Sequence, residues 1–395
     1  MQGFDFKCPT EVVFGAHAEE RIAEKLRAYG AARVFIVYGG GSVIRTGLLS
    51  RIERLLTAGG LAFRVLGGVQ PNPRVSLVRE GVREAIAFGA NFILAVGGGS
   101  VIDSAKAIAH GASNPETDVW DFWTGRAKLE KTMPFGSVLT LAAAGSETSD
   151  SAVLTNEDMQ QKLGLNTALN RPVIAFLNPE LAFTAPKRQI VCGISDILMH
   201  TMERYFTNVK QPNVFSDRVA ESLLTTVMDA SHTAVKNPHD YDAMSEIMWC
   251  GSVSHCNLTE LGRGKDFTVH RLGHPLSARY DATHGATLTA LWPSWAAYVY
   301  KDDASRFAQF AKRLFGITDG TEEERARAGI AHMKAYFEEL GMPANLPALL
   351  GHPLGKADIE RLADDATAGG TKKLGSFHPI AKKEAIAIYT LANQA

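Results

Sequence analysis

Three histidines in the stretch VHRLGHPLSARYDATHGATL (269–288) have the types and spacing that most directly indicate chemistry in this 395-residue chain. His270 and His274 are four residues apart, so on a helix they share one face, and His284 follows ten residues later. Apolar and small residues separate them, and the stretch has the pattern of a buried helix. Buried ring nitrogens need partners, and a metal ion is one such partner.

A second pair of potential metal ligands lies in GISDILMHTMERY, where Asp196 and His200 are again four residues apart among apolar neighbours. One carboxylate and several imidazoles suit Zn²⁺ or Fe²⁺ better than Mg²⁺ or Ca²⁺, and a cysteine-rich structural zinc site is not indicated. Such pairs also arise by chance, and backbone carbonyls commonly satisfy a buried histidine. The spacing alone therefore leaves metal binding open.

Two glycine-rich turns follow strand-like runs in the first half of the chain. GGGSVID (97–103) follows the apolar run NFILAV, and YGGGSVIRTG (38–47) follows RVFIV. Glycines let a phosphate approach the backbone, and N–H groups at a helix start favour negative charge. The first turn lacks the Gly-x-Gly-x-x-Gly fingerprint, since Ile102 stands at the third glycine, and plain turn formation is the alternative. Asp103 and Lys106 would reach a cofactor's ribose and nicotinamide, or merely form a solvated helical turn.

The elements that must position these residues divide the chain in two. Strand-like and amphipathic helical segments alternate through the first half, which predicts βαβ units and a parallel sheet. After about Pro186 the patterns are almost entirely helical. We therefore predict a Rossmann-like, dinucleotide-binding α/β domain over residues 1–185 and an all-α, metal-binding domain over residues 186–395.

Composition indicates a soluble globular protein of the cytoplasm. Hydrophobic residues make up 46% and charged residues 21%, and 41 Lys+Arg oppose 42 Asp+Glu, so neither nucleic acid nor an anionic membrane is indicated as a partner. The four cysteines have no CxxC spacing, which is typical of reduced thiols. The first residues do not resemble a signal peptide, and no run reaches the ~18 apolar residues of a membrane span.

Seven motifs together resemble the iron-containing (group III) alcohol dehydrogenases. In chain order they are PTEVVFGA, VQPNP, VGGGSVIDSAKAIA, TLAAAGSE, GISDILMHTMERY, HRLGHPLSARYDATHG and LGSFHPI. The similarity covers nearly the whole chain and is strongest to the branch of NADPH-dependent aldehyde reductases and butanol dehydrogenases. It implies a metal-dependent enzyme that interconverts primary alcohols and aldehydes, often as a homodimer.

The resemblance implies a role for each candidate residue. The four metal ligands fall on Asp196, His200, His270 and His284, and His274 falls beside them without being a ligand. We expect His274 to relay the proton, because histidine titrates near neutral pH. The cofactor positions are Gly97, Gly98, Gly99, Ser100, Asp103, Lys106, Asn72, Lys162, Thr140 and Thr148. Ala143 and Ala144 depart from the family, in which threonine is frequent there.

Cofactor preference is predicted from the end of the run RVFIVY. NAD-preferring relatives have an acidic residue where this chain has Gly39, so nothing repels a 2′-phosphate there. Gly40, Ser42 and Arg45 could bind one, which predicts NADP(H), with Fe²⁺ or Zn²⁺ as the metal.

Two alternatives share the same two-domain layout, a dehydroquinate synthase-like lyase and a glycerol dehydrogenase-like enzyme. The lyase needs a basic pocket for its phosphate-bearing substrate, and the segments near the ligands supply few basic residues, notably Arg263, Lys265 and Arg271. A non-catalytic nucleotide-binding or metal-storage protein is a further possibility. The sequence does not specify the substrate.

Overall fold

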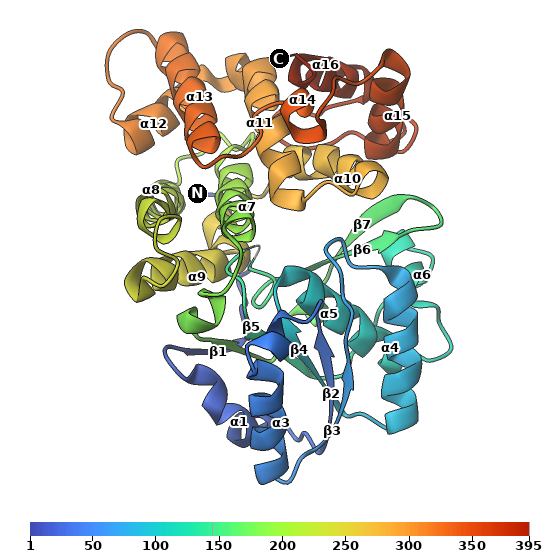
Figure 1. Cartoon of the computed structure of the whole chain (residues 1–395). Helices are drawn as coiled ribbons and strands as arrows, with labels where there is room; N and C mark the ends of the chain where they lie inside the picture. Colours follow the sequence, from blue (N-terminus) through green and yellow to red (C-terminus); the bar gives the residue numbers. More distant parts are fainter. Residues whose placement is uncertain (144, 395) are drawn as a thin grey trace. The chain divides into compact units, whose positions relative to one another are not determined.

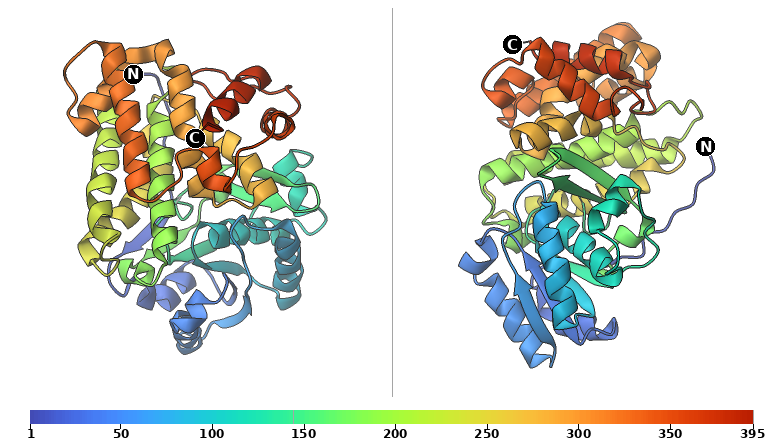
Figure 2. Two further views of the ribbon diagram at one scale, coloured as in Figure 1. Left: turned by 45° about the horizontal axis from the view of Figure 1, so that its top comes forward. Right: turned by 90° about the vertical axis from the view of Figure 1, so that its right-hand side faces the viewer.

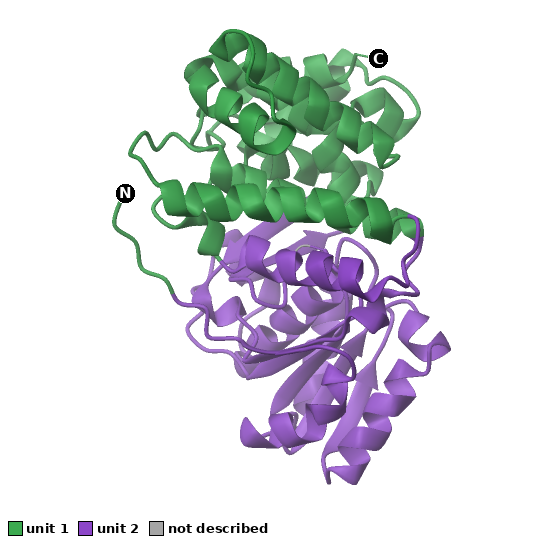
Figure 3. Cartoon of the chain, turned by 90° about the vertical axis from the view of Figure 1, so that its left-hand side faces the viewer, with its two compact units in different colours: residues 1–6, 187–235, 257–395 green, residues 7–186, 236–256 purple. Residues whose placement is uncertain are grey.

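The computed structural model describes residues 1–143 and 145–394. The chain forms two units, coloured separately in Figure 3: unit 1 comprises Met1–Phe6, Lys187–Val235 and Asn257–Ala395, and unit 2 comprises Lys7–Pro186 and Lys236–Cys256. The chain leaves unit 2 for unit 1 after Pro186, close to the predicted domain boundary. Residues 236–256, which were expected in the helical half, belong to unit 2. The assignment of separate roles to two domains stays a prediction.

Unit 2 is built on a six-stranded sheet with the order β1-β8-β5-β4-β2-β3. All neighbouring strands are parallel, which confirms the predicted α/β architecture. Its strands are β1 (Glu11–Phe14), β2 (Arg33–Tyr38), β3 (Ala62–Leu66), β4 (Phe92–Gly97), β5 (Phe135–Leu139) and β8 (Ile174–Leu177). The two strand-like runs that precede the glycine turns are β2 and β4.

Helices cover both faces of this sheet (Figure 1). Helices α1 (Ile22–Ala28) and α3 (Leu48–Ala58) share a hydrophobic core with alternate residues of β2 and β4, such as Val34 and Ile36. The intervening residues face the other way, where α4 (Val75–Phe88) and α5 (Gly99–Ser113) pack. Because both faces are buried, the strands are almost uniformly apolar in sequence.

The chain reverses its direction of travel across the sheet between β2 and β4. From β2 it moves outward to β3 at one edge, and β4, paired with β2 on the other side, leads toward β5 and β8. Such a switch point, at the carboxyl ends of parallel strands, is where α/β sheets bind their ligands.

Smaller elements complete unit 2. Strands β6 (Ser151–Asn156) and β7 (Gln161–Asn166) form a separate antiparallel hairpin. Helix α9 (Tyr241–His255) packs on the short helix η3 (Pro179–Ala182). The remaining helices are η1 (Ala18–Arg21), α2 (Ser42–Arg45), α6 (Val119–Thr124) and η2 (Ala168–Asn170).

The part of unit 1 that the structure describes is helical, as predicted. Helix α11 (His284–Val299) is apolar almost all round and packs against α7 (Lys187–Tyr205), α10 (Thr268–Tyr280), α13 (Glu322–Glu339) and α16 (Lys382–Ala392). Helix α13 lies side by side with α12 (Ala304–Phe315) (Figure 2). The other helices are α8 (Val214–Ala234), η4 (Leu258–Glu260), η5 (Tyr300–Asp303), α12 (Ala304–Phe315), α14 (Leu346–Leu350) and α15 (Lys356–Thr367). No helix in the described residues is long and apolar enough to cross a membrane.

Candidate metal centre and cofactor site

Helix α7 places the first two predicted ligands on one face. Its residues from Ile190 to Tyr205 are all buried, which explains the apolar residues around the Asp-x-x-x-His pair. Asp196 Oδ1 lies 3.4 Å from His200 Nε2. The four-residue spacing therefore places Asp196 and His200 on the same face of α7, with their polar atoms close together.

The three histidines of the opening stretch belong to two helices, not to one continuous buried helix. His270 and His274 lie on α10, which ends at Tyr280, because Asp281 adopts a left-handed conformation with φ 49°. Helix α11 then begins at His284. The turn lets α11 fold back on α10 and brings His284 close to His270, with their ring centroids 5.2 Å apart.

Gly285 permits the close packing of α11 against α7, which brings His284 near α7. A Cβ atom on Gly285 would lie 2.3 Å from the carbonyl oxygen of Cys192 on α7. No side chain is accommodated at that distance, so α11 approaches α7 there through bare backbone. Because Asp196 lies one turn after Cys192, this contact sets the separation of His284 and Asp196.

The four predicted metal ligands thus converge within unit 1. Ligand atoms of Asp196, His270 and His284 lie within 4.8 Å of one another. Asp196 Oδ1 lies 3.6 Å from His270 Nε2 and 3.8 Å from His284 Nε2. His200 joins them through its 3.4 Å approach to Asp196 and a ring centroid 4.4 Å from that of His270.

The residues fit a divalent metal. Asp196 Oδ1 and His270 Nε2 are buried and have no hydrogen-bond partner among the described residues. Unpartnered polar atoms are costly in a protein interior, and here they face a common point. One carboxylate oxygen and three imidazole nitrogens make a four-ligand set suited to Fe²⁺ or Zn²⁺.

Glu203, which no sequence motif indicated, orients one of the ligands. Its Oε2 pairs with His270 Nδ1, and its Oε1 accepts from the backbone N–H groups of Val269 (2.6 Å) and His270 (3.4 Å). The carboxylate therefore holds the ring proton on Nδ1 and leaves Nε2 for a metal ion. Glu203 lies seven residues after Asp196 on α7, a same-face spacing that could have revealed it.

The charges around His270 have an electrostatic consequence. Burial alone would lower the pKa of His270, but the carboxylates of Glu203 and Asp196 outweigh it and raise the pKa to about 9. Without metal the ring is therefore protonated at neutral pH, and a metal ion has to displace the Nε2 proton.

His274 lies one turn beyond His270 on α10. It is partly exposed, and its ring centroid is 6.0 Å from that of His284. The structure thus places His274 next to the ligand cluster, as the family resemblance implied. Its role in proton transfer stays a prediction.

Both glycine turns lie at the switch point of the sheet in unit 2. Tyr38 at the end of β2 pairs with Val96 near the end of β4, so Gly39 and Gly97 leave the sheet at the same edge. A Cβ on Gly97 would lie 2.5 Å from Val101 Cγ2. Ser100 is in the first turn of α5, which begins at Gly99, and Ser42 begins the short helix α2. Gly40 and Ser42 are exposed.

Asp103 and Lys106 make their contacts within unit 2. Asp103 accepts hydrogen bonds from Ser146 Oγ (2.6 Å) and the N–H of Val153 (2.9 Å). The fully buried Lys106 donates to Ser146 Oγ (2.8 Å) and to the carbonyl of Ser151 (2.7 Å). Burial lowers the pKa of Lys106 to about 8 and raises that of Asp103. The pair anchors α5 to the segment that leads into β6, and contact with a cofactor stays a prediction.

The other predicted cofactor residues are placed as follows. Lys162 Nζ donates to Asn72 Oδ1 at 2.9 Å, so these two residues, far apart in sequence, are neighbours. Thr140 donates its backbone N–H to the carbonyl of Gly97 at 3.1 Å. Thr148 is buried, and its hydroxyl donates to the carbonyl of Ser252 at 2.8 Å. Ala143 is described, and Ala144 lies outside the described residues.

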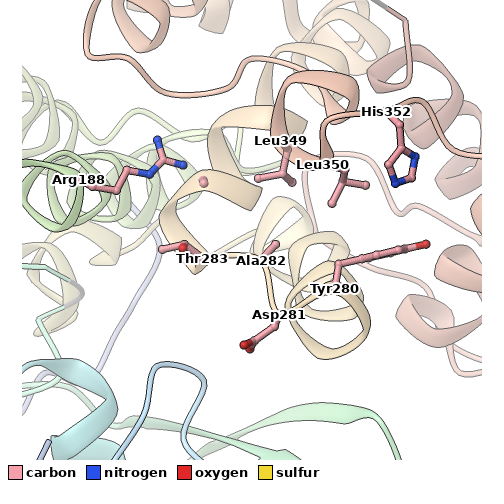
Figure 4. A pocket seen from close by; sticks show the side chains of 9 residues that line it. Arg188, Tyr280, Asp281, Ala282, Thr283, Leu349, Leu350 and His352 are labelled. Carbon is pink, nitrogen blue, oxygen red and sulfur yellow. The ribbon is translucent and has the colours of Figure 1, made fainter. Parts of the chain in front are cut away.

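A pocket of about 350 Å³ lies beside the turn between α10 and α11 (Figure 4). Tyr280 and Thr283 line it from the turn, with Arg188 on one side and Leu349 and His352 on the other. No predicted ligand lines it, so it is distinct from the metal cluster.

Comparisons with known proteins agree with this geometry. The family model "Iron-containing alcohol dehydrogenase" matches residues 9–179, and "Fe-containing alcohol dehydrogenase family, C-terminal" matches residues 190–393. The chain is 36% identical over 391 residues to NADH-dependent butanol dehydrogenase A of Clostridium acetobutylicum, covering 98% of this chain and 99% of the relative. It is 35% identical over 396 residues to the NADPH-dependent aldehyde reductase YqhD of Escherichia coli, covering 99% and 100%.

A solved structure has the same fold over the whole chain. The crystal structure of NADH-dependent butanol dehydrogenase A from Thermotoga maritima superposes with a TM-score of 0.95 at 33% identity, covering 100% of this chain and 99% of the other.

Proposed function

The chain belongs to the iron-containing alcohol dehydrogenase family, and on this premise we propose that it interconverts aldehydes and primary alcohols by hydride transfer. One observation carries the proposal: Asp196, His200, His270 and His284, drawn from three helices, converge on one point. The two glycine turns at the switch point of the sheet supply a place for the nicotinamide dinucleotide.

A divalent ion held by the four ligands would act as a Lewis acid toward the carbonyl oxygen, and the dinucleotide would supply or accept the hydride. The side chains of the site retain the ion and orient its ligands. Asp196 contributes the negative charge that retains the ion, and Glu203 fixes His270 in the tautomer that ligates.

Proton transfer falls to His274 in this proposal. Reduction of an aldehyde leaves an oxygen that needs a proton, and oxidation of an alcohol releases one. His274 is partly exposed, lies one turn from His270 and is not part of the ligand cluster, so it can exchange protons with solvent.

We propose NADP(H) as the preferred dinucleotide. The relatives named above differ in cofactor, so the proposal depends on the turn after β2. Glycines 39–41 follow Tyr38, no carboxylate side chain stands there, and the side chains of Ser42 and Arg45 are exposed. A 2′-phosphate would therefore meet N–H groups, a hydroxyl and a guanidinium.

The test is turnover of butyraldehyde by the metal-loaded protein with NADPH and NADH in parallel. We expect NADPH oxidation that depends on added Fe²⁺ or Zn²⁺ and a higher kcat/KM with NADPH. Equal kcat/KM for both dinucleotides would contradict the cofactor preference. Absence of turnover with every aldehyde of a panel, using either dinucleotide, would contradict the function itself.

The lyase alternative loses support in unit 1. Arg263, one of the few basic residues near the ligands, is buried and paired with Asp217 at 2.9 and 2.6 Å, so it is committed to the fold. Action in the cytoplasm as a homodimer also stays a proposal. Light scattering on the purified protein tests the dimer.

A further inference from the structure

Arg204, the residue after Glu203 on α7, is a cation in contact with a predicted metal ligand of unit 1. Its side chain is fully buried. Its Nη1 donates to the His200 carbonyl at 2.9 Å and lies 3.5 Å from His200 Nδ1. The other nitrogen of that ring, Nε2, faces Asp196 in the ligand cluster. A guanidinium, which stays charged in proteins, therefore stands at the ring nitrogen that does not face the cluster.

Two further contacts hold this guanidinium in place. Its Nε donates to Glu260 Oε2 at 2.8 Å, in an ion pair with a carboxylate of η4. Its Cζ lies 4.8 Å from the ring centroid of Phe267, whose centroid is 5.6 Å from that of His200 and 4.8 Å from that of His270. Its Nη2 is buried and has no hydrogen-bond partner among the described residues. Because Glu260 pairs with Nε whereas Nη1 is the nitrogen near His200, the ion pair does not cancel the positive field at that ligand.

His200 and His270 therefore have opposite charges behind two rings that face the same cluster. The Glu203 carboxylate pairs with His270 Nδ1 and increases the electron density that Nε2 can donate to an ion. The cation beside His200 Nδ1 has the reverse effect, because it draws electron density away from the ring and repels a divalent ion. An ion that receives less electron density from its ligands polarises a carbonyl oxygen more strongly.

We propose that Arg204 acts on the metal through His200: it makes His200 the weakest of the four ligands, lowers the affinity for the ion and raises the Lewis acidity of the ion. Arg204 is thus a positioning residue. A purely structural role predicts that loss of the guanidinium weakens metal binding, whereas this proposal predicts that the same change tightens it. The effect on Lewis acidity rests on the proposed function, while the effect on affinity requires only that the four ligands hold an ion.

The experiment measures zinc affinity of the full-length protein by chelator competition at pH 7.5, thermal unfolding of the apo-protein, and kcat for butyraldehyde with saturating NADPH. An outer partner that is directly hydrogen-bonded to a ligand typically changes metal affinity ~10–100-fold. Because Nη1 lies 3.5 Å from His200 Nδ1, we expect a smaller effect, with Arg204→Gln binding Zn²⁺ about 3–10-fold more tightly than the wild type. Its kcat should be lower. Arg204→Lys, which keeps the charge, should lie between Arg204→Gln and the wild type in both properties.

Two controls separate the charge of Arg204 from its packing. Arg306 is also a buried arginine over an aromatic ring, with Cζ 3.5 Å from the centroid of Tyr205, but its hydrogen bonds go to the Tyr205 carbonyl and to Asp217. Arg306→Gln should therefore lower the stability and leave the zinc Kd at the wild-type value. Glu260→Gln removes the compensating negative charge, so it should bind Zn²⁺ more weakly, and combining it with Arg204→Gln should restore tight binding.

Each outcome supports or contradicts a stated part of the proposal. Weaker or unchanged zinc binding in a folded Arg204→Gln variant would overturn it and leave the guanidinium a packing role. If Arg204→Gln does not fold, Glu260→Gln decides, because zinc affinity equal to or above that of the wild type would overturn the proposal. Tighter zinc binding without a lower kcat would overturn the link to Lewis acidity. Absence of aldehyde turnover in the wild type would instead count against the proposed function.

Discussion

Replacement of Glu203 by glutamine tests how the metal centre is organised. In the wild type one carboxylate oxygen accepts from the Val269 N–H, and the other pairs with His270 Nδ1. If the glutamine carbonyl keeps the bond to Val269, its NH₂ group faces Nδ1 and donates to it. The ring proton then moves to Nε2, the atom intended for the metal.

The alternative rotamer of the glutamine at position 203 also loses one of the two hydrogen bonds that the glutamate makes. Turning the amide places its NH₂ group against the Val269 N–H, so two donors face each other and a buried N–H loses its acceptor. Loss of such an outer-shell carboxylate typically weakens metal binding about 10–100-fold, or about 1.4–2.7 kcal/mol. We expect Glu203→Gln to fall in this range.

The assay is competition with a chromogenic chelator at pH 7.5, using Zn²⁺ or anaerobic Fe²⁺, alongside thermal unfolding of the apo-protein. Glu221→Gln is the matched control, because Glu221 is a buried carboxylate that accepts from Tyr205 of α7 at 2.9 Å and contacts no predicted ligand. Glu203→Asp should recover part of the affinity. Equal metal affinity in wild type, Glu203→Gln and Glu221→Gln would refute the reasoning.

Three further predictions concern the same framework. His274→Ala should retain its metal in elemental analysis but lose ~10²-fold in kcat; a metal-free variant would show that the ligands are misassigned. Gly285→Ala should lose about 1–3 kcal/mol of stability and bind metal more weakly in chelator competition, because its Cβ would lie 2.3 Å from the Cys192 carbonyl oxygen. Burial lowers the pKa of His110 to about 4, so the folded protein binds fewer protons than the unfolded chain between pH 6.5 and 4. Stability should therefore fall by roughly 3 kcal/mol as the pH falls through this window, and His110→Gln should abolish that part of the loss in denaturant titrations.

Local sequence patterns were sufficient for much of the fold. The apolar runs before the two glycine turns predicted β2 and β4, and the alternation of strand-like and helical segments predicted the parallel sheet, because strand and helix periodicity are set by near neighbours. The proximity of Asp196 and His200 was also predictable, because residues four apart on a helix lie on the same face. Resemblance to a family supplied the ligand set and the function.

Other features depended on the tertiary structure, because they join residues that no local pattern connects. The break at Asp281 and the bare-backbone contact of Gly285 with Cys192 decide where His284 lies. The role of Glu203 in orienting His270 emerges only when helices α7 and α10 pack together. The sequence by itself determined which side chains could do chemistry. The packing of helices and loops decided which of them meet, because the positions of distant segments depend on contacts summed over the whole chain.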